Sequence, residues 1–292
     1  MIKGEKVRID IHNILYSIYK YNKTLNNPSI KKIISKHDDD DIAFLNNVVL
    51  TSMRFHLHSI NIISKYIKKK LRDHEKILLI SAITQIVFLE FKDYAVINCS
   101  VEIAKKLKIY HGLINASLKK ISKDKIKLRK TNIRFSDFPK WFKDKTNSLT
   151  IKEKRNFLMN FTQEPSLHIV FKNHKKLKIF EKDIIQTSSI SGFLKDKKNF
   201  QKIESFKNGD WWVQDFSSFF PLQNLEIKNK NAKILDACAA PGGKSFQLLS
   251  KNFNIVLNDK SSSRIEILKN NLNRLNLHSK ISNKDFTKYY EN

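Results

Sequence analysis

The 292-residue sequence has few of the residues that cross-link or interrupt a chain: two Cys, five Pro and six Gly. Cys99 and Cys238 are too few for a disulfide scaffold or for a metal cluster with four thiolate ligands, and they suit a reducing compartment. Long hydrophobic runs are also absent, because the most apolar stretch, 77–91, is shorter than the ~20 residues of a membrane span and contains Ser81 and Glu90. The N-terminus lacks the apolar core of a signal peptide. We therefore expect a cytoplasmic protein that makes no membrane contact.

The sequence also lacks a metal-binding pattern. None of its nine His has Cys or carboxylate neighbours at the spacing of metal ligands. His56, His58, His168 and His174 are therefore predicted to be core or surface histidines, and we expect no metal site.

Acidic residues are scarce relative to basic ones. The chain has 28 Asp and Glu against 55 Lys and Arg, which gives a formal net charge of +27. Only eight of the basic residues are Arg, so part of the Lys excess is attributable to an A+T-rich genome. The remaining surplus favours a polyanionic partner, with nucleic acid ahead of an acidic membrane surface.

Hydrophobic periodicity predicts an all-helical region over 1–128. Apolar residues recur at helical spacing in six segments, and the acidic run 38–41 suits a helix N-terminus. The segments are 7–20, 42–50, 60–71, 75–91, 95–107 and 112–121. The charged stretch 122–130 fits equally well a solvated linker, a fraying helix end or a phosphate-contacting strip.

Two further regions follow. Residues 129–225 hold all three Trp and three of the five Pro, and they predict a linker and a small α+β subdomain with a helix at 151–161 and strands at 167–171 and 179–180. From residue 231 the chain alternates strands with helices. Strands are expected at 233–237, 254–258 and 280–282, and helices at 244–251 and 261–275. This order is typical of a parallel, doubly wound sheet.

The loop 238–243 carries the strongest chemical signal. It leaves the carboxyl end of the first strand of that sheet, where such folds bind ligands. Gly242 and Gly243 lack the Cβ atoms that would keep a ligand from the backbone, and the next helix directs free N–H groups into the same crevice. Asp259 ends the second strand, where an acid accepts hydrogen bonds from ribose hydroxyls. Asp285, after the third strand, is placed to meet an adenine edge.

Three cofactors compete for this loop. The NAD fingerprint G-x-G-x-x-G is absent, and only Gly243-Lys244-Ser245 matches the end of the P-loop G-x-x-x-x-G-K-[ST], whose first Gly position holds Cys238. S-adenosylmethionine carries no phosphate and needs close backbone approach and a ribose carboxylate. The residues therefore favour a methyl donor first, a nucleoside triphosphate second and NAD third.

The motifs also carry a family resemblance. Residues 236–244, Asp-Ala-Cys-Ala-Ala-Pro-Gly-Gly-Lys, resemble the cofactor motif of the Sun/Fmu family of RNA cytosine-C5 methyltransferases. Residues 212–218 resemble the V-Q-D-x-S-S segment of that family. Arg8 with 95–106 and 112–118 is similar to the NusB-like RNA-binding domain. This order is the layout of family members that modify bacterial 16S ribosomal RNA.

The resemblance implies a fold, a cofactor and a partner. It implies a NusB-like helical RNA-binding domain at 1–128, a linker and small α+β subdomain at 129–225, and an incomplete Rossmann-like S-adenosylmethionine-binding domain at 226–292. Asp259 would bind the ribose of the cofactor and Asp285 would lie near its adenine, with Arg264 as a weaker candidate. The partner would be ribosomal RNA, and we expect a monomer. The loop residues that would hold the methionine and ribose part are Cys238, Ala239, Ala240, Pro241, Gly242, Gly243 and Lys244.

The reaction of that family needs a thiolate that these residues do not supply. Methylation at cytosine C5 requires a thiolate to add to C6 first, and the family places this Cys, and a second that assists release, after the fourth and later strands. Cys238 belongs to the cofactor loop and Cys99 to the helical region. We therefore expect no catalytic residue here, a chain that is a fragment or has lost its C-terminal region, poor cofactor binding and no methyl transfer. The alternative is an RNA-binding NusB-like protein without catalytic activity.

Overall fold

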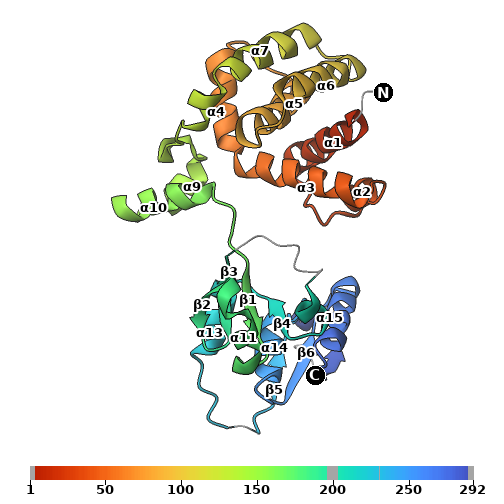
Figure 1. Ribbon diagram of the computed structural model, residues 1–292, viewed down its shortest axis with the longest axis vertical. Coiled ribbons are helices and arrows are strands. Elements are labelled where there is room, and N and C mark those ends of the chain that lie inside the picture. Colours follow the sequence, from red (N-terminus) through yellow and green to blue (C-terminus); the bar gives the residue numbers. More distant parts are fainter. Residues whose placement is uncertain (1–3, 196–202, 230, 289–292) are drawn as a thin grey trace. The chain divides into compact units, whose positions relative to one another are not determined.

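The computed structural model describes residues 4–195, 203–229 and 231–288. The chain folds into two compact units, Met1–Gln163 and Glu164–Asn292 (Figure 1). The three-part division expected from the sequence groups these residues differently, since residues 129–163 lie in the first unit. Residues 164–225 lie in the second unit together with the parallel sheet.

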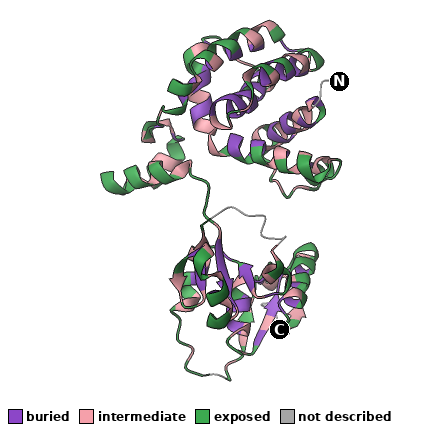
Figure 2. Ribbon diagram, viewed as in Figure 1, coloured by how far each residue is buried: buried purple, intermediate pink, exposed green. Residues whose placement is uncertain are grey.

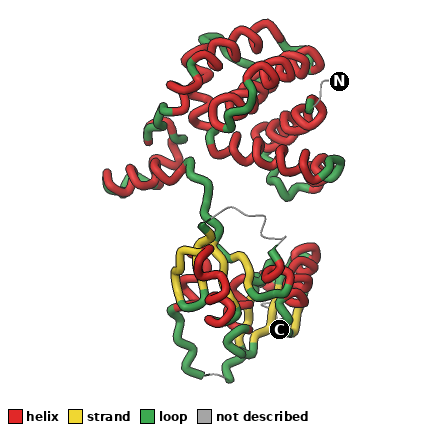
Figure 3. The backbone as a smooth tube through the Cα atoms, in the orientation of Figure 1, coloured by secondary structure: helices red, strands yellow, loops and turns green. Residues whose placement is uncertain are grey.

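The first unit is helical, as the sequence predicts (Figure 3). Asp38 caps α3 by accepting a hydrogen bond from the Asp41 N–H at 2.8 Å. Residues 77–83 of α5 are all buried, so this helix lies in the core, whereas α10 buries no residue (Figure 2). The helices are α1 (Glu5–Tyr21), α2 (Pro28–Ile34), α3 (Asp39–Arg54), α4 (His56–Tyr66), α5 (Asp73–Ile83), the π-turn η1 (Thr84–Phe88), α6 (Asp93–Lys106), α7 (His111–Lys123), α8 (Lys125–Arg129), the 3-10 turn η2 (Phe135–Asp137), α9 (Lys140–Lys145) and α10 (Ile151–Phe161).

The charged stretch 122–130 is a packed part of this bundle. It ends α7 and forms α8, whose Leu128 is buried. The Arg129 Nε donates to the Val87 carbonyl at 2.7 Å, and Lys125 pairs with Asp93 at 2.8 Å. At least two of its charges therefore serve internal contacts.

The second unit begins with a four-stranded antiparallel sheet in the order β2-β3-β1-β4. The strand predicted at 167–171 is confirmed as β1, whereas the strand predicted at 179–180 is wrong. Those residues end α11, which Asn173 caps by accepting from the Lys176 N–H at 3.1 Å. The elements are β1 (His168–Phe171), α11 (His174–Phe180), η3 (Glu181–Asp183), β2 (Ile184–Ser188), β3 (Ser191–Leu194), α12 (Glu204–Lys207), β4 (Trp211–Val213) and α13 (Phe216–Gln223).

A parallel three-stranded sheet in the order β5-β6-β7 follows, which confirms the predicted strand–helix alternation. Ile234 pairs with Ile255 across the first two strands, and Leu257 pairs with Ile281 across the next two. The elements are β5 (Ile234–Asp236), α14 (Gly243–Leu249), β6 (Ile255–Asn258), α15 (Ser262–Arg274), β7 (Lys280–Ser282) and η5 (Phe286–Lys288).

The two sheets of the second unit share one hydrophobic core. Val170, Trp212 and Phe219 from the antiparallel part pack in the same cluster as Phe246 and Leu268 from the parallel part. Burying such side chains contributes ~1.5–3 kcal/mol each, so the shared cluster fixes β4 and α13 against α14 and α15. None of the helices described is both long enough and apolar enough to cross a membrane.

Candidate cofactor cleft of the second unit

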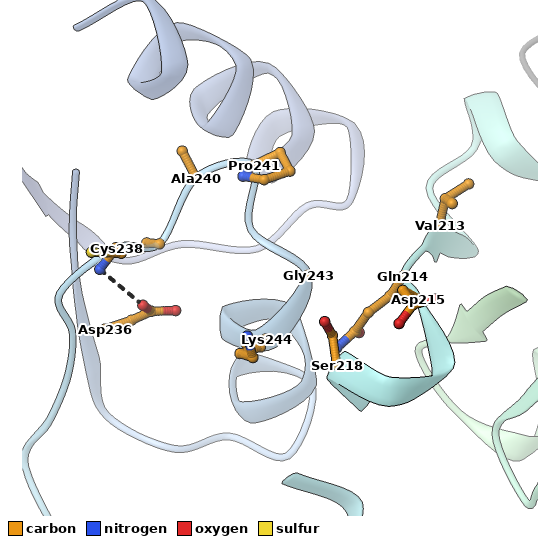
Figure 4. A pocket seen from close by; sticks show the side chains of 11 residues that line it. Val213, Gln214, Asp215, Ser218, Asp236, Cys238, Ala240, Pro241, Gly243 and Lys244 are labelled. Carbon is orange, nitrogen blue, oxygen red and sulfur yellow. Dashed lines mark hydrogen bonds between the residues drawn. The ribbon is translucent and has the colours of Figure 1, made fainter. Parts of the chain in front are cut away.

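A cleft of about 240 Å³ opens where two segments meet: the end of β4 with the start of α13, and the loop between β5 and α14. Figure 4 shows Gln214 and Ser218 on one side of Lys244 and Asp236 and Cys238 on the other. Of the expected loop residues, Gly242 does not line the cleft. The lining consists of Val213, Gln214, Asp215, Ser218, Asp236, Cys238, Ala239, Ala240, Pro241, Gly243 and Lys244.

The β5–α14 loop is anchored by the side chain that precedes it. The Asp236 carboxylate accepts from the Cys238 N–H at 3.3 Å, drawn in Figure 4, and from the Ser245 hydroxyl at 2.6 Å. The Ala239 N–H donates to the Asn258 carbonyl at 2.7 Å. Both ends of the loop are thus tied to the sheet and to α14, so its backbone holds a fixed path along the cleft.

The two loop glycines have different roles. Gly242 has a φ of +119°, and a Cβ there would lie 1.9 Å from Cζ of Phe246, so this glycine makes room for its own helix. A Cβ on Gly243 would lie 3.2 Å from Cγ of Gln214, a cleft residue. Gly242 therefore makes room for Phe246 and Gly243 borders the cleft, and the expectation that both positions clear space for a ligand stays a prediction.

Asn258 connects the ends of all three parallel strands. Its buried side-chain amide donates to the Ala237 and Lys284 carbonyls, both at 3.0 Å. Its side-chain oxygen accepts from the Ser282 hydroxyl at 2.6 Å and from the Lys284 N–H at 3.0 Å. A single side chain therefore positions the loops that follow β5 and β7.

Asp259 follows β6 and is only 3% exposed. Its Oδ1 accepts from the Ser261 N–H at 3.0 Å, whereas its buried Oδ2 has no hydrogen-bond partner within the described part of the chain. The Arg264 Nη1 lies 3.5 Å from that Oδ2, and the same guanidinium donates to the Ala240 carbonyl. The structure thus brings the weaker candidate Arg264 to both the loop and Asp259, although Asp259 does not line the cleft.

Asp285 lies after β7 and also outside the cleft lining. Its Oδ1 accepts from the Thr287 N–H at 3.1 Å and from the Thr287 hydroxyl at 2.7 Å, and that side-chain hydrogen bond is the main cause that lowers the pKa of Asp285. The Lys260 Nζ lies 3.9 Å from Oδ2. Asp285 is therefore held as an anion at the same edge of the sheet as Asp259.

The site residues expected from the sequence omitted Gln214, Asp215 and Ser218. Asp215 caps α13 by accepting from the Ser217 N–H at 3.0 Å, and the Ser217 hydroxyl lowers the pKa of its carboxyl group. The V-Q-D-x-S-S resemblance could have placed these three residues. Because it and the cofactor motif resemble the same family, the two segments could be expected to lie close to each other.

His168 and Cys99 take structural positions. His168 is buried, with its Nδ1 2.8 Å from the Gln214 carbonyl and its Nε2 2.9 Å from the Thr187 hydroxyl, and burial lowers its pKa. The prediction of a core histidine is confirmed there. Over the described ranges, no three His, Cys, Asp or Glu side chains are grouped to hold a metal ion. Burial raises the pKa of the Cys99 thiol, and Cys238 is exposed.

Two segments of the chain match known protein families. Residues 5–123 match the NusB family, and residues 222–292 match the family described as 16S rRNA methyltransferase RsmB/F. The ribosomal RNA small subunit methyltransferase B of Proteus mirabilis is 26% identical over 281 residues, which cover 88% of this chain and 65% of that protein. The probable methyltransferase B of Coxiella burnetii is 25% identical over 226 residues, or 70% and 52% of the two chains.

The fold has a solved counterpart. The crystal structure of PH0851 superimposes with a TM-score of 0.62 at 15% identity, covering 99% of this chain and 71% of that one. This chain spans about two thirds or less of the length of the two relatives above. The chain therefore joins a segment similar to the NusB family, residues 5–123, to a segment similar to the RsmB/F family of 16S rRNA methyltransferases, residues 222–292.

Proposed function

We propose that this chain supplies the RNA-binding and cofactor-binding parts of an S-adenosylmethionine-dependent methyltransferase that acts on cytosine C5 of small-subunit ribosomal RNA. The observation that carries the proposal is the cleft in which the two motif segments, 213–218 and 236–244, face each other. Two segments about twenty residues apart in sequence and both typical of one family form one site.

The residues present fit the cofactor. When bound, S-adenosylmethionine supplies a methyl group on a positively charged sulfur. Asp259 offers a buried carboxylate oxygen that lacks a hydrogen-bond partner among the described residues, and ribose hydroxyls are donors of the kind it requires. Asp285 would accept from the adenine edge. The methionine and ribose part would lie along Cys238, Ala239, Ala240, Pro241, Gly242, Gly243 and Lys244.

The first unit supplies the charge for RNA. It contains 33 Lys and Arg against 15 Asp and Glu, which gives a formal charge of +18. Such a surplus favours a polyanion, and the NusB match covers 5–123 of this unit. We therefore assign ribosomal RNA contacts to it.

Neither cysteine is proposed as the nucleophile that C5 methylation requires. Cys99 is buried in α6, and its raised pKa keeps it a thiol at neutral pH. Cys238 lies in the loop assigned to the cofactor, where its N–H is bonded to Asp236. We therefore also propose that the 292 residues alone do not transfer a methyl group. An RNA-binding NusB-like protein without catalytic activity is the alternative.

Calorimetry with S-adenosylhomocysteine and with ATP, each at high concentration because we expect poor cofactor binding, tests the cofactor part of the proposal. We expect a weak signal with the former and none with ATP. Asp259→Asn should weaken that signal at least about tenfold, since a charged acceptor contributes more than a neutral one. Glu266→Gln is the matched control, because Glu266 is an exposed acid on α15 outside the cleft. Binding of ATP without S-adenosylhomocysteine would overturn the proposal in favour of a P-loop-like site.

A further inference from the structure

Two cavities of the first unit share a wall formed by Tyr19 of α1 and His56 of α4. One has a volume of about 190 Å³ and includes Lys20, Asp73 and Lys76 in its lining. The other has a volume of about 360 Å³, within the ~300–1,000 Å³ of small-ligand sites. The two cavities adjoin at these two side chains, one with a charged lining and the other with an aromatic one, and the pair is called here the Tyr19–His56 groove.

The aromatic end is formed mainly by the region that includes α9 and α10. Trp141 is 67% exposed, and its ring lies 5.7 Å from that of Phe142 at an interplanar angle of 89°. Phe138 and Phe157 complete this end with ring centroids 5.5 Å apart. Phe138 is buried. The exposed Trp141 ring and the half-buried Phe142 and Phe157 rings provide flat apolar faces on which a planar ring stacks.

The charged end carries more positive than negative charge. Lys20 pairs with Asp73 at 2.6 Å. Lys76 is exposed, and no ion pair or hydrogen bond of its ammonium group is found among the described residues. Burial and the nearby Lys76 lower the pKa of His56 to about 4, so His56 is neutral at pH 7 and the positive charge of this end comes from lysine.

We propose that the Tyr19–His56 groove binds an unpaired nucleotide of single-stranded RNA, with the base at Trp141 and Phe142 and a phosphate at Lys76. Aromatic faces beside lysine are the combination with which proteins hold single-stranded nucleic acid, and the +18 charge of the unit attracts the backbone. The proposal rests on the RNA-binding role proposed above and names the site and the strandedness of the RNA it takes.

Trp141 provides a direct measurement. Trp211 and Trp212 are 0% and 2% exposed, so Trp141 is the solvent-accessible tryptophan of the chain. The difference between the emission of the wild-type protein and that of Trp141→Phe isolates its signal. We expect single-stranded oligouridylate to quench this signal and a blunt RNA duplex of the same length to leave it unchanged. Equal quenching by the duplex, or none by the single strand while it binds, overturns the proposal.

Affinity measurements with the full chain give the second test. Trp141→Ala should weaken single-strand binding by about 5- to 150-fold, the range for loss of one stacked base, whereas Trp141→Phe should retain most of the affinity. Lys76→Ala should weaken binding. It should also reduce the slope of the logarithm of the association constant against the logarithm of the salt concentration by about one. The matched controls are Tyr110→Ala and Lys119→Ala, which remove an exposed aromatic ring and an exposed lysine outside the groove.

Other occupants of the groove give distinct outcomes. If Trp141 emits in RNA-free protein at the wavelength of a buried tryptophan, the groove is already covered by protein and the proposal is wrong. If RNA binds and Trp141→Ala binds as wild type does, only this inference fails. If neither single-stranded nor duplex RNA binds at low salt, the RNA-binding role itself fails.

Discussion

The Gln214 side-chain amide donates to the side-chain oxygen of Gln247 at 2.7 Å, and this buried contact joins the start of α13 to α14. The Trp212 indole donates to the Gln214 oxygen at 2.9 Å, and the Gln247 amide donates to the Phe219 carbonyl at 3.1 Å. Of these residues, Gln214 lines the candidate cleft, so these hydrogen bonds hold one cleft residue in place. Buried polar networks of this kind stabilise one conformation when every member is paired.

Replacing Gln247 with Leu is expected to break this network. The substitution leaves the buried Gln214 amide without its acceptor and removes the Gln247 donor from the Phe219 carbonyl, so we expect a loss of about 1–3 kcal/mol in the free energy of unfolding of the second unit. Urea unfolding followed by Trp211 and Trp212 emission measures it, because both rings are buried in that unit. Gln186→Leu, at an exposed position, is the control and should cost less than about 1 kcal/mol.

The two loop glycines are expected to tolerate alanine unequally. Gly242→Ala places a side chain at a φ of +119° and against the Phe246 ring, so it should destabilise the second unit by at least about 2 kcal/mol. Gly243 does not have a positive φ, and its Cβ would lie 3.2 Å from Cγ of Gln214, a tight contact that a small shift relieves, so Gly243→Ala should cost about 1 kcal/mol or less. Thermal unfolding of the two variants compares them directly, and equal losses would contradict the different roles assigned to these glycines.

The first unit is expected to lose stability in mild acid through His12. Burial and the neighbouring His74, whose Nδ1 is 3.0 Å from the His12 Nε2, lower the pKa of His12 from 6.5 to about 4. Between these values the unfolded chain binds a proton that the folded chain does not, so stability present above pH 6.5 falls as the pH drops towards 4. The contribution is on the order of 2 kcal/mol.

Helix unfolding by urea, followed by circular dichroism at about pH 7.5 and about pH 5, tests this dependence. His12→Gln should reduce the difference between the two conditions, because it removes the titrating ring. His111→Gln, at an exposed position, should leave the difference unchanged. A wild-type protein equally stable at both pH values would contradict the assignment.

RNA affinity is expected to fall steeply with salt. For 6–10 lysine–phosphate contacts the association constant drops by about 10³–10⁵ between 50 and 200 mM salt. Fluorescence anisotropy over a salt series gives the slope, with an uncharged peptide nucleic acid of the same sequence as the control. An association that does not change with salt would indicate a different class of partner.

The 292-residue protein is expected to incorporate no methyl group into cytosine. The reason is chemical, since the C5 reaction needs a thiolate, Cys99 is a buried thiol and Cys238 lies in the loop that we propose for the cofactor. Incubation with ribosomal RNA and a labelled methyl donor tests this. Label in cytosine that disappears with Cys238→Ser would show that the loop cysteine is the nucleophile and that its assignment to the cofactor is wrong.

The strand–helix alternation of the parallel sheet was predictable, whereas short elements outside this alternation were not. The strand expected at 280–282 is β7, and the apolar runs on either side of α14 give β5 and β6 to within one or two residues. The pair 179–180 is too short to show a period, and the Asn173 cap makes it part of α11. The β2–β3 hairpin was missed, because its partly exposed strands lack a continuous apolar run.

The candidate site was predictable on one side only. The glycine-rich loop has a local motif, but its approach to 213–218 depends on packing between residues far apart in sequence, such as Trp212 and Phe246 with ring centroids 5.7 Å apart. The role of Gly242 was also hidden, since only the φ angle and the position of the Phe246 ring show which atoms the missing Cβ would meet.

The guanidinium of Arg274 in α15 donates to the Phe206 and Trp211 carbonyls at 2.6 and 3.1 Å, and the hydrophobic cluster spans both sheets. A chimera that exchanged only residues 226–292 for those of a relative would cut through this cluster and break both bonds. Exchange at the 163/164 boundary would leave each interior whole, so that position, and not the start of the parallel sheet, is where this chain is best recombined with its relatives.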